Sequence, residues 1–416
     1  MKKWVILFFF ALVLRLGFVL LWHNQGMDTH ISDDGTEYYA IGKNIFKGKG
    51  FEVAGESPGR RPPLYSVFIA ALLKFPFPTA VYLAQAFIGA TACLLLGALG
   101  KEMFNEQVGF FAALMLSIDY MSVRQIVTVL AEGLFVFFLL GSFFCFFLAV
   151  RQKKDIWFVA SGALMGLGLL TKDVLVFFLP LFLLGVFFWG KEWKAGLRKA
   201  ILLGGSVLIV IAPWVTKNIL LFKRPVLITV SSGHTFYLGN NPKAMEGGAT
   251  GGDWTLGRES YLPDDMPRLY TIEADRYLMK KGLEFVHEHP HRFFELMGLK
   301  IINMWRPYQT DSPSLSKWAT VFTYVPVLMF GVVGLFLNLK QWHKFFPVFT
   351  VIGYVFLLYA VMIAQIRYRY QIMPFFMIFA AHAFFELRKK ISSLRKPVLI
   401  GERLRRRHEE MARDLN

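Results

Sequence analysis

The sequence has few cysteines, few charged residues and few acidic residues for its length. Only 2 of its 416 residues are cysteine, and both lie inside apolar runs, which excludes a disulfide scaffold and a cysteine-based zinc site. Charged residues make up 18% of the chain, against about 25% in soluble domains. These shortages exclude a disordered chain and an ordinary cytosolic enzyme.

Apolar and aromatic residues take the place of the missing charge. Hydrophobic residues make up 55% of the chain, and 43 residues are phenylalanine. Because a transmembrane helix needs about 20 mostly apolar residues, the pattern predicts an all-α polytopic membrane protein with about ten transmembrane helices. The apolar runs lie at about 4–22, 79–100, 107–121, 132–150, 156–171, 173–189, 200–216, 318–338, 345–364 and 370–387.

The net charge of +17 is distributed unevenly along the chain. With the N-terminus in the cytoplasm, alternate connecting segments carry most of the lysines and arginines, as the positive-inside rule requires. We therefore expect an integral membrane protein with both termini in the cytoplasm, in a bacterial inner membrane. The basic balance reflects this topology and attraction to anionic lipids, so nucleic acid is not an expected partner.

This topology divides the chain into four parts. Residues 1–216 form an N-terminal transmembrane module whose first outside loop is 23–78, and 217–317 form a large outside loop. Residues 318–387 form the C-terminal transmembrane helices. Residues 388–416 form a basic cytoplasmic tail. Within the first loop, Thr36–Phe46 and Pro63–Phe75 are amphipathic or too short to cross, which predicts helices that lie on the membrane surface.

Ionisable residues of the predicted outside turns gather at one membrane face. A transport path would spread such groups through the depth of the bilayer, whereas only Arg15 is clearly intramembrane. The residues at the outside face are Asp33, Asp34, Arg60, Arg61, Arg124, Glu132, Lys172, Asp173, Arg367 and Arg369.

This mixture of cations and carboxylates suits one kind of chemistry. Arginine and lysine bind phosphate, a carboxylate can take the proton of an attacking hydroxyl, and a departing lipid phosphate needs charge stabilisation. The set therefore points to glycosyl transfer from a polyprenyl-phosphate sugar.

Six segments, in order, resemble motifs of one superfamily. They are SDDGTEYYAIGKNIFKGKGF, RRPPLYSVFIAALL, TVLAEGLFVFF, LGLLTKDVLVFFLP, PWVTKNILLFKRPVLITVSSGHTFYLGNNP and RYRYQIMPFF. The chain resembles the GT-C glycosyltransferases, specifically the protein O-mannosyltransferase-like group (glycosyltransferase family 39), which is related to the lipid A aminoarabinose and galacturonic acid transferases. Lys217 departs from the pattern, because many relatives carry arginine there and lysine lacks its planar fork.

The resemblance implies a GT-C-type bundle and an inverting, lipid-phosphate-sugar-dependent transferase with an extracytoplasmic site. It implies that the catalytic carboxylate is Asp34, which fits the spacing to Tyr38, or alternatively Asp33, with Glu132 as the second acid. The donor phosphate would contact Arg60, Arg61, Lys172, Arg367 and Arg369, and the acceptor cavity would include Tyr38, Tyr65 and Asn240. The acceptor could be lipid A, another glycolipid, a cell-envelope polymer or a protein hydroxyl.

Structural roles remain open for these residues. Asp33 and Asp34 could cap the helix that begins near Thr36, and the cations could extend to the interface and contact lipid headgroups. No cofactor is required, although a divalent metal could bridge Asp34 and a phosphate. The stretch His287–His291 is expected to bind no metal, because Pro290 interrupts a helix through it.

Two other functions remain as alternatives. A polysaccharide polymerase or ligase would use a lipid-diphosphate donor, and a transporter of lipid-linked sugars would perform no chemistry. The six ordered motifs argue against the former, and the clustering of charge at one face argues against the latter.

Overall fold

The computed structural model describes residues 2–24, 33–51, 59–189, 192–245, 262–308 and 313–414, with side chains up to residue 393. All regular structure in these ranges is helical, which confirms the predicted all-α class. The elements are α1 (Lys2–Asn24), α2 (Asp33–Phe46), α3 (Pro63–Leu72), α4 (Thr79–Met103), α5 (Glu106–Ile118), α6 (Tyr120–Arg124), η2 (Gln125–Val127), α7 (Glu132–Gln152), α8 (Asp155–Thr171), η3 (Asp173–Leu175), α9 (Phe178–Trp189), α10 (Trp193–Phe222), α11 (Ser232–Gly239), η4 (Pro242–Met245), α12 (Ile272–Glu288), α13 (Pro290–Trp305), α14 (Ser314–Leu337), η7 (Leu339–Gln341), α15 (Trp342–Val361), η8 (Ile366–Gln371) and α16 (Met373–Asp414).

The predicted apolar runs fall mainly on helices, but fewer of them than the expected ten are long enough to be full spans. Six helices in the described ranges are long and apolar enough to cross a membrane: α1, α4, α7, α10, α14 and the segment that contains α15. Helices α5 and α6 make a seventh span if they count together, bent by 54°. Helices α8 and α9, with 17 and 12 residues, are shorter than a full span.

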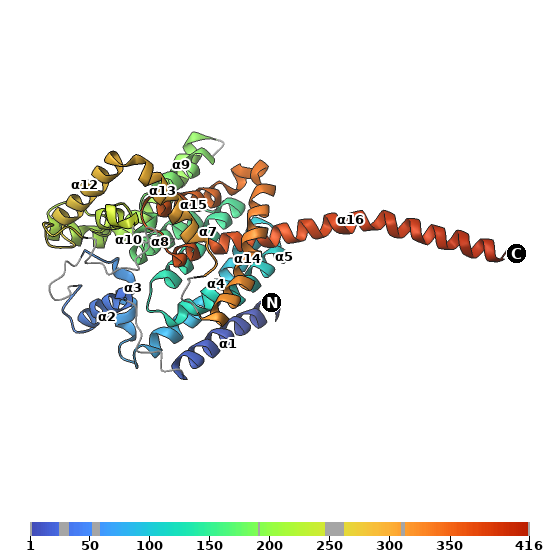
Figure 1. The fold of residues 1–416 in the computed structure, drawn as a ribbon, viewed down its shortest axis with the longest axis horizontal. Coiled ribbons are helices and arrows are strands. Elements are labelled where there is room, and N and C mark those ends of the chain that lie inside the picture. The colour runs from blue at the N-terminus through green and yellow to red at the C-terminus, as the bar shows by residue number, and fades with distance from the viewer. Residues whose placement is uncertain are drawn as a thin grey trace.

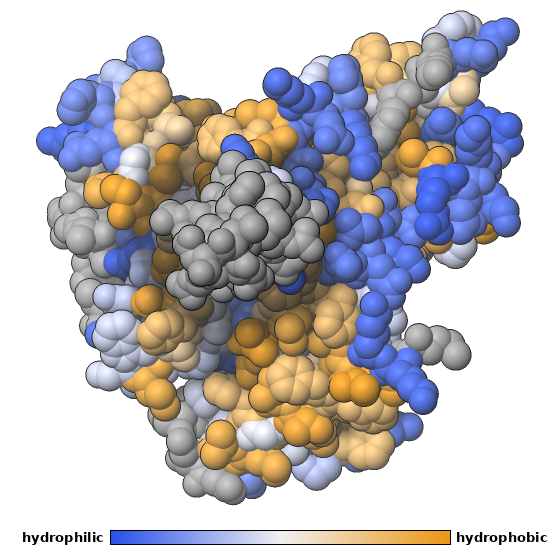
Figure 2. All heavy atoms as spheres, turned by 90° about the vertical axis from the view of Figure 1, so that its right-hand side faces the viewer, coloured by the Kyte–Doolittle hydropathy of each residue, from blue (hydrophilic) through white to orange (hydrophobic). Residues whose placement is uncertain are grey.

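Helix α7 forms the centre of the bundle. Of its most apolar stretch, 72% is buried, against 22% for α1. It packs against α4 and α8, and Phe135, Phe143 and Phe146 lie in the core. The outer helices instead expose large apolar side chains, such as Phe9 on α1 and Ile209 on α10, as helices in contact with lipid do. Figure 2 shows such apolar areas on the face from which α16 leaves, with patches of hydrophilic residues beside them.

The loops predicted to be cytoplasmic meet at one end of the bundle. Ion pairs join Lys3 to Glu106 at 2.7 Å and Arg151 to Glu102 at 2.9 Å, and Lys344 Nζ donates to the Met103 carbonyl at 2.7 Å. Helix α16 extends away from the rest of the fold (Figure 1). The opposite end is formed by α2, α3, η3, η8 and the segment that includes α11, α12 and α13.

Helices α2 and α3 pack against each other beside the bundle. Their close approach depends on Gly42, because a Cβ atom there would lie 2.9 Å from Ile69 Cγ2 and 3.1 Å from the Ser66 carbonyl oxygen. Pro63 begins α3, where its missing N–H costs no helical hydrogen bond. Helices are thus present at both expected segments, although α2 begins at Asp33 rather than near Thr36, and α3 ends at Leu72, before Phe75.

Arg15 is fully buried within α1, and its role is structural. Its guanidinium donates to the carbonyls of Ala11, Leu116 and Ser117 at 3.1–3.3 Å and to Ser122 Oγ at 2.9 Å. Ala11 lies one turn earlier on α1, whereas Leu116, Ser117 and Ser122 lie at the bend between α5 and α6, where the α5 backbone leaves its own carbonyls available. Arg15 therefore stabilises the bend that brings α6 and η2 to the site.

Candidate active site

A cavity of about 610 Å³ opens at the end of the bundle where the predicted outside turns meet. Its walls come from segments far apart in the sequence: α2, the segment before α3, α6, η2, η3, α11, the start of α14 and η8. Of the predicted residues, the cavity is lined by Asp34, Tyr38, Arg60, Arg61, Glu132, Lys172 and Arg367. The sequence-based prediction that these turns share a face is therefore matched by one continuous cavity.

Helix α2 presents two carboxylates, Asp34 and Glu37, which are one turn apart. This spacing places both on the same side of the helix, opposite the consecutive residues Arg60 and Arg61. Arg61 Nε donates to Glu37 Oε2 at 2.7 Å, and its Nη2 lies 2.5 Å from Asp34 Oδ1. Arg60 pairs with the other Glu37 oxygen, and its guanidinium lies 3.8 Å from the ring centroid of Tyr270. Glu37 thus holds both arginines in place.

The second oxygen of Asp34 contacts a residue more than three hundred positions away in the sequence. Arg367 Nη2, from η8, lies 2.7 Å from Asp34 Oδ2, while its Nε donates to Gln365 Oε1 at 2.8 Å. Burial alone would raise the pKa of Asp34, but the charges of Arg61 and Arg367 outweigh it and hold that pKa well below its usual range. Asp34 is therefore ionised and tightly paired.

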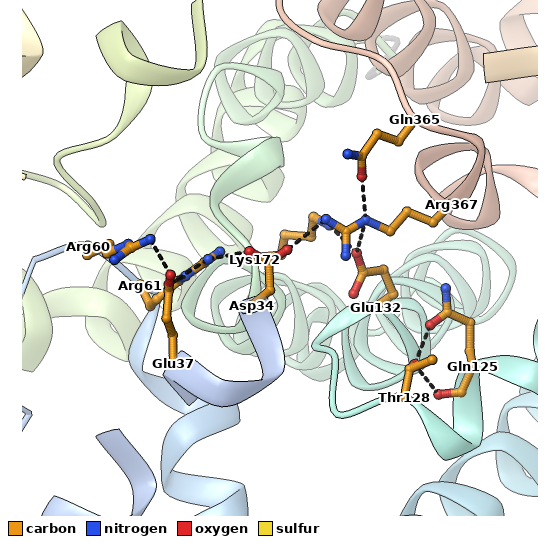
Figure 3. Close-up of polar contacts among 10 residues, drawn as sticks. All are labelled: Asp34, Glu37, Arg60, Arg61, Gln125, Thr128, Glu132, Lys172, Gln365 and Arg367. Atoms are coloured by element: carbon orange, nitrogen blue, oxygen red, sulfur yellow. Dashed lines mark hydrogen bonds and ion pairs between the residues drawn. The ribbon is translucent and has the colours of Figure 1, made fainter. Parts of the chain in front are cut away.

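Glu132 and Lys172 form a second ion pair beside the first. Glu132 is the first residue of α7, and Lys172 lies between α8 and η3. Lys172 Nζ lies 2.8 Å from Glu132 Oε1, and Arg367 Nε lies 3.9 Å from the same oxygen. Arg367 therefore links the two carboxylates, as Figure 3 shows. Around the centre, the cations Arg60, Arg61, Lys172 and Arg367 face the carboxylates of Asp34, Glu37 and Glu132. The cavity is also lined by Arg124 and Asp173, so five cations and four carboxylates leave one positive charge for an anion.

Three of the predicted site residues do not line the cavity. Arg369 is 1% exposed, and its guanidinium donates to the carbonyls of Met304, Arg306 and Pro307. Tyr65 donates to Gln85 Oε1 at 2.9 Å and supports the Tyr38 ring edge-on. Asn240 accepts a hydrogen bond from Lys300 Nζ at 2.9 Å and donates to the Val361 carbonyl. Each stabilises the frame of the site.

Asp33 begins α2, but its side chain lies outside the described residues. The choice between Asp33 and Asp34 as the catalytic carboxylate therefore stays a prediction. The segment before α2 includes residues 25–32 and also lies outside the described ranges, so the capping roles expected for the pair stay predictions.

Two residues contribute to the site although neither was assigned a specific role there from the sequence. Glu37 fixes both arginines, and its spacing of three from Asp34 was the available signal. Asp173, next to Lys172, lines the cavity and accepts a hydrogen bond from Thr229 Oγ1.

Metal ligation is not evident in the described part of the chain. No group of three or more His, Cys, Asp and Glu side chains there converges as metal ligands, at His287–His291 or in the cavity. Asp34 and Glu132 instead face guanidinium and ammonium groups.

Comparisons with known proteins bear on the family and the fold of the chain. A family model described as dolichyl-phosphate-mannose-protein mannosyltransferase matches residues 60–216. A candidate mannosyltransferase of Bacillus subtilis, YkcB, is 31% identical over 186 residues, which is 42% of this chain and 26% of that protein. The oligosaccharyltransferase of Archaeoglobus fulgidus, in its apo form, matches 94% of this chain and 51% of its own, with a TM-score of 0.58 and 12% identity. The chain shares the fold of this archaeal oligosaccharyltransferase.

A second structure of the same archaeal oligosaccharyltransferase is a complex with an inhibitory peptide and a dolichol-phosphate. It matches 94% of this chain and 51% of its own, with the same TM-score of 0.58 and 13% identity. The chain spans about half the length of these structures and about a quarter of the Bacillus protein. The family match includes Arg60, Arg61, Glu132 and Lys172, whereas Asp34 and Arg367 lie outside it.

Proposed function

We propose that this protein is an integral membrane glycosyltransferase that moves a sugar from a polyprenyl-phosphate-linked donor to an acceptor hydroxyl outside the membrane. The observation that carries the proposal is the partly buried Asp34 between Arg61 and Arg367, with Lys172 and Glu132 beside them in one cavity. One excess positive charge matches the single negative charge of a phosphodiester donor. The archaeal structure that contains dolichol-phosphate has the same fold.

In the proposed reaction, the acceptor oxygen attacks the anomeric carbon from the side opposite the phosphate, so the configuration inverts. A new carbon–oxygen bond forms while the bond from the anomeric carbon to the phosphate oxygen breaks, and its electron pair leaves with the phosphate. Asp34 takes the acceptor proton. The products are the glycosylated acceptor and polyprenyl phosphate.

The cations act on the leaving group. A departing lipid phosphate gains negative charge, and fixed guanidinium and ammonium groups in a partly buried site stabilise that charge without protonating it. Arg367, Arg61 and Lys172 fill this role, and Arg60 supports Arg61 through Glu37. Glu132 holds Lys172 at the cavity wall, and Tyr38 lines the cavity beside Asp34. Because four cations supply the positive charge, we expect transfer to persist after divalent metals are chelated.

The donor class can be tested in membranes that contain the protein. We expect label from a radioactive polyprenyl-phosphate sugar to reach a glycolipid, envelope polymer or protein acceptor. A polymerase or ligase would instead use the matching diphosphate donor, and a transporter would move label across the bilayer without transferring it. Mass spectrometry of envelope glycoconjugates, with and without the protein, then identifies the acceptor.

The proposed location is a bacterial inner membrane, with the cavity outside and both termini in the cytoplasm. The support is that basic loops meet at the end of the bundle opposite the cavity. A reporter fused after Asn416 should be cytoplasmic, and a tag near Gly251 should be accessible from outside. A cytoplasmic tag near Gly251 would contradict this orientation.

A further inference from the structure

Asp34 is held in a state that opposes its proposed role. One of its oxygens is 2.5 Å from Arg61 and the other is 2.7 Å from Arg367. A carboxylate paired with two guanidinium groups is a weak base, in keeping with a pKa well below its usual range. For Asp34 to take a proton from an acceptor, one of these arginines must move away from it.

The two arginines are not equally bound. Arg61 is also held by Glu37, because its Nε and its Nη2 each lie 2.7 Å from Glu37 Oε2, and Glu37 is itself fixed by Arg60. Arg367 has a neutral partner at its Nε, Gln365, and its next carboxylate is 3.9 Å away. Arg61 is therefore held by more carboxylate contacts than Arg367, and Arg367 is the arginine that an incoming anion can withdraw.

The position of Arg367 favours such an exchange. Its Nε and the Nζ of Lys172 both approach Glu132 Oε1, so the two cations flank the same point of the cavity wall. A phosphate that enters there meets two cations, and the guanidinium of Arg367 can bind it through two hydrogen bonds. Because Arg367 exchanges one anion for another, its guanidinium is never left in the cavity without an anionic partner.

We propose that the donor phosphate takes Arg367 away from Asp34, so that Asp34 becomes a competent base only when the donor is bound. This inference rests on the proposed function. It assigns Arg367 two successive partners, first Asp34 and then the phosphate. It also predicts that the donor binds before the acceptor reacts, so that Asp34 takes no proton from the acceptor while the donor site is empty.

Binding of polyprenyl phosphate, the reaction product, tests the exchange without knowledge of the acceptor. If Asp34 competes with phosphate for Arg367, Asp34→Asn should bind polyprenyl phosphate more tightly than the wild type. The gain should be roughly tenfold or more, the size of one charge-assisted hydrogen bond. If Asp34 instead positions Arg367 for phosphate, the same variant should bind more weakly. Asp34→Ala serves as a second variant if the amide does not give a folded protein.

A double-mutant cycle separates competition from simple charge repulsion. In an Arg367→Met background, Asp34→Asn should give less than a twofold gain, because the shared partner is absent. An equal gain in both backgrounds would mean that Asp34 only repels the phosphate, and this would overturn the proposal. Asp173→Asn is the matched control, since Asp173 lines the cavity but contacts Thr229 rather than Arg367, and its gain should be smaller than that of Asp34→Asn.

The transferase proposal and the exchange proposal fail on different results. If the wild-type protein shows no saturable binding of polyprenyl phosphate, the proposed donor class fails. If it binds but Asp34→Asn binds equally or more weakly, the exchange fails and the transferase proposal stands.

Discussion

Replacing Lys172 by methionine removes one half of a buried ion pair and leaves the other half in place. The Glu132 side chain is 3% exposed, and Lys172 Nζ lies 2.8 Å from its Oε1. Removing one partner of a buried pair costs about 3–5 kcal/mol. Lys172 is 18% exposed, however, and Arg367 stays 3.9 Å from the same oxygen, so we expect a loss of about 2–3 kcal/mol in the free energy of unfolding.

The measurement is thermal unfolding of the purified protein in detergent, read by loss of the monodisperse species. Lys172→Met should unfold at a lower temperature than the wild type, and adding Glu132→Gln should restore most of the loss, because the second change removes the uncompensated charge. Lys172→Arg should be close to the wild type in stability. A double variant that is as unstable as the single one would show that burial of the Glu132 charge is not the cause, and would refute the reasoning.

Three further predictions concern residues inside and outside the cavity. Arg61→Ala should lower kcat/KM for the donor by an amount equivalent to about 1.5–3 kcal/mol, and unchanged kinetics would mean that Arg61 contacts no phosphate. Arg15→Met should lower stability by about 1–3 kcal/mol, because the buried carbonyls of Leu116 and Ser117 lose their donor, while the affinity of the folded protein for polyprenyl phosphate stays the same; a changed affinity with unchanged stability would contradict this role. Burial lowers the pKa of Lys300 to about 7, whereas the unfolded chain keeps its proton up to about pH 10.4, so stability should rise from pH 7 to pH 9 in the wild type. Lys300→Met should reduce that rise in unfolding temperature, and an equal rise in both proteins would exclude Lys300 as its source.

The sequence allowed the location of the site to be predicted well, because membrane topology depends on patterns that are local in the chain. Apolar runs and alternating basic loops place Asp34, Arg61, Glu132, Lys172 and Arg367 at one end of the bundle, and the structure brings their side chains together in one cavity.

The direction of individual side chains could not be predicted in the same way. Arg367 and Arg369 are two residues apart, and in a 3₁₀ helix, with about three residues per turn, they point to different sides. Arg367 therefore reaches Asp34, whereas Arg369 reaches backbone carbonyls at the C-terminal end of α13. Similarly, Asn240 is held by Lys300, which is sixty residues later in the chain and carries no signal of that contact.

Glu37 shows a different limit of pattern reading. Glu37 lies in the segment Thr36–Phe46, which has an amphipathic pattern, yet its side chain is only 16% exposed and contacts both Arg60 and Arg61. The hydrophobic pattern does not distinguish a face that meets water from one that meets the charged groups of another segment.

The central claim is that Asp34 is the base of a transferase that uses a polyprenyl-phosphate sugar. The most direct test is the rate of sugar transfer from such a donor, at saturating donor concentration, by wild type, Asp33→Asn, Asp34→Asn and the double amide, each at matched amounts of folded protein. The account predicts that Asp34→Asn loses a factor of about 10²–10⁴ in rate while it still binds polyprenyl phosphate, and that Asp33→Asn is affected much less. Full transfer activity in the double amide would contradict it.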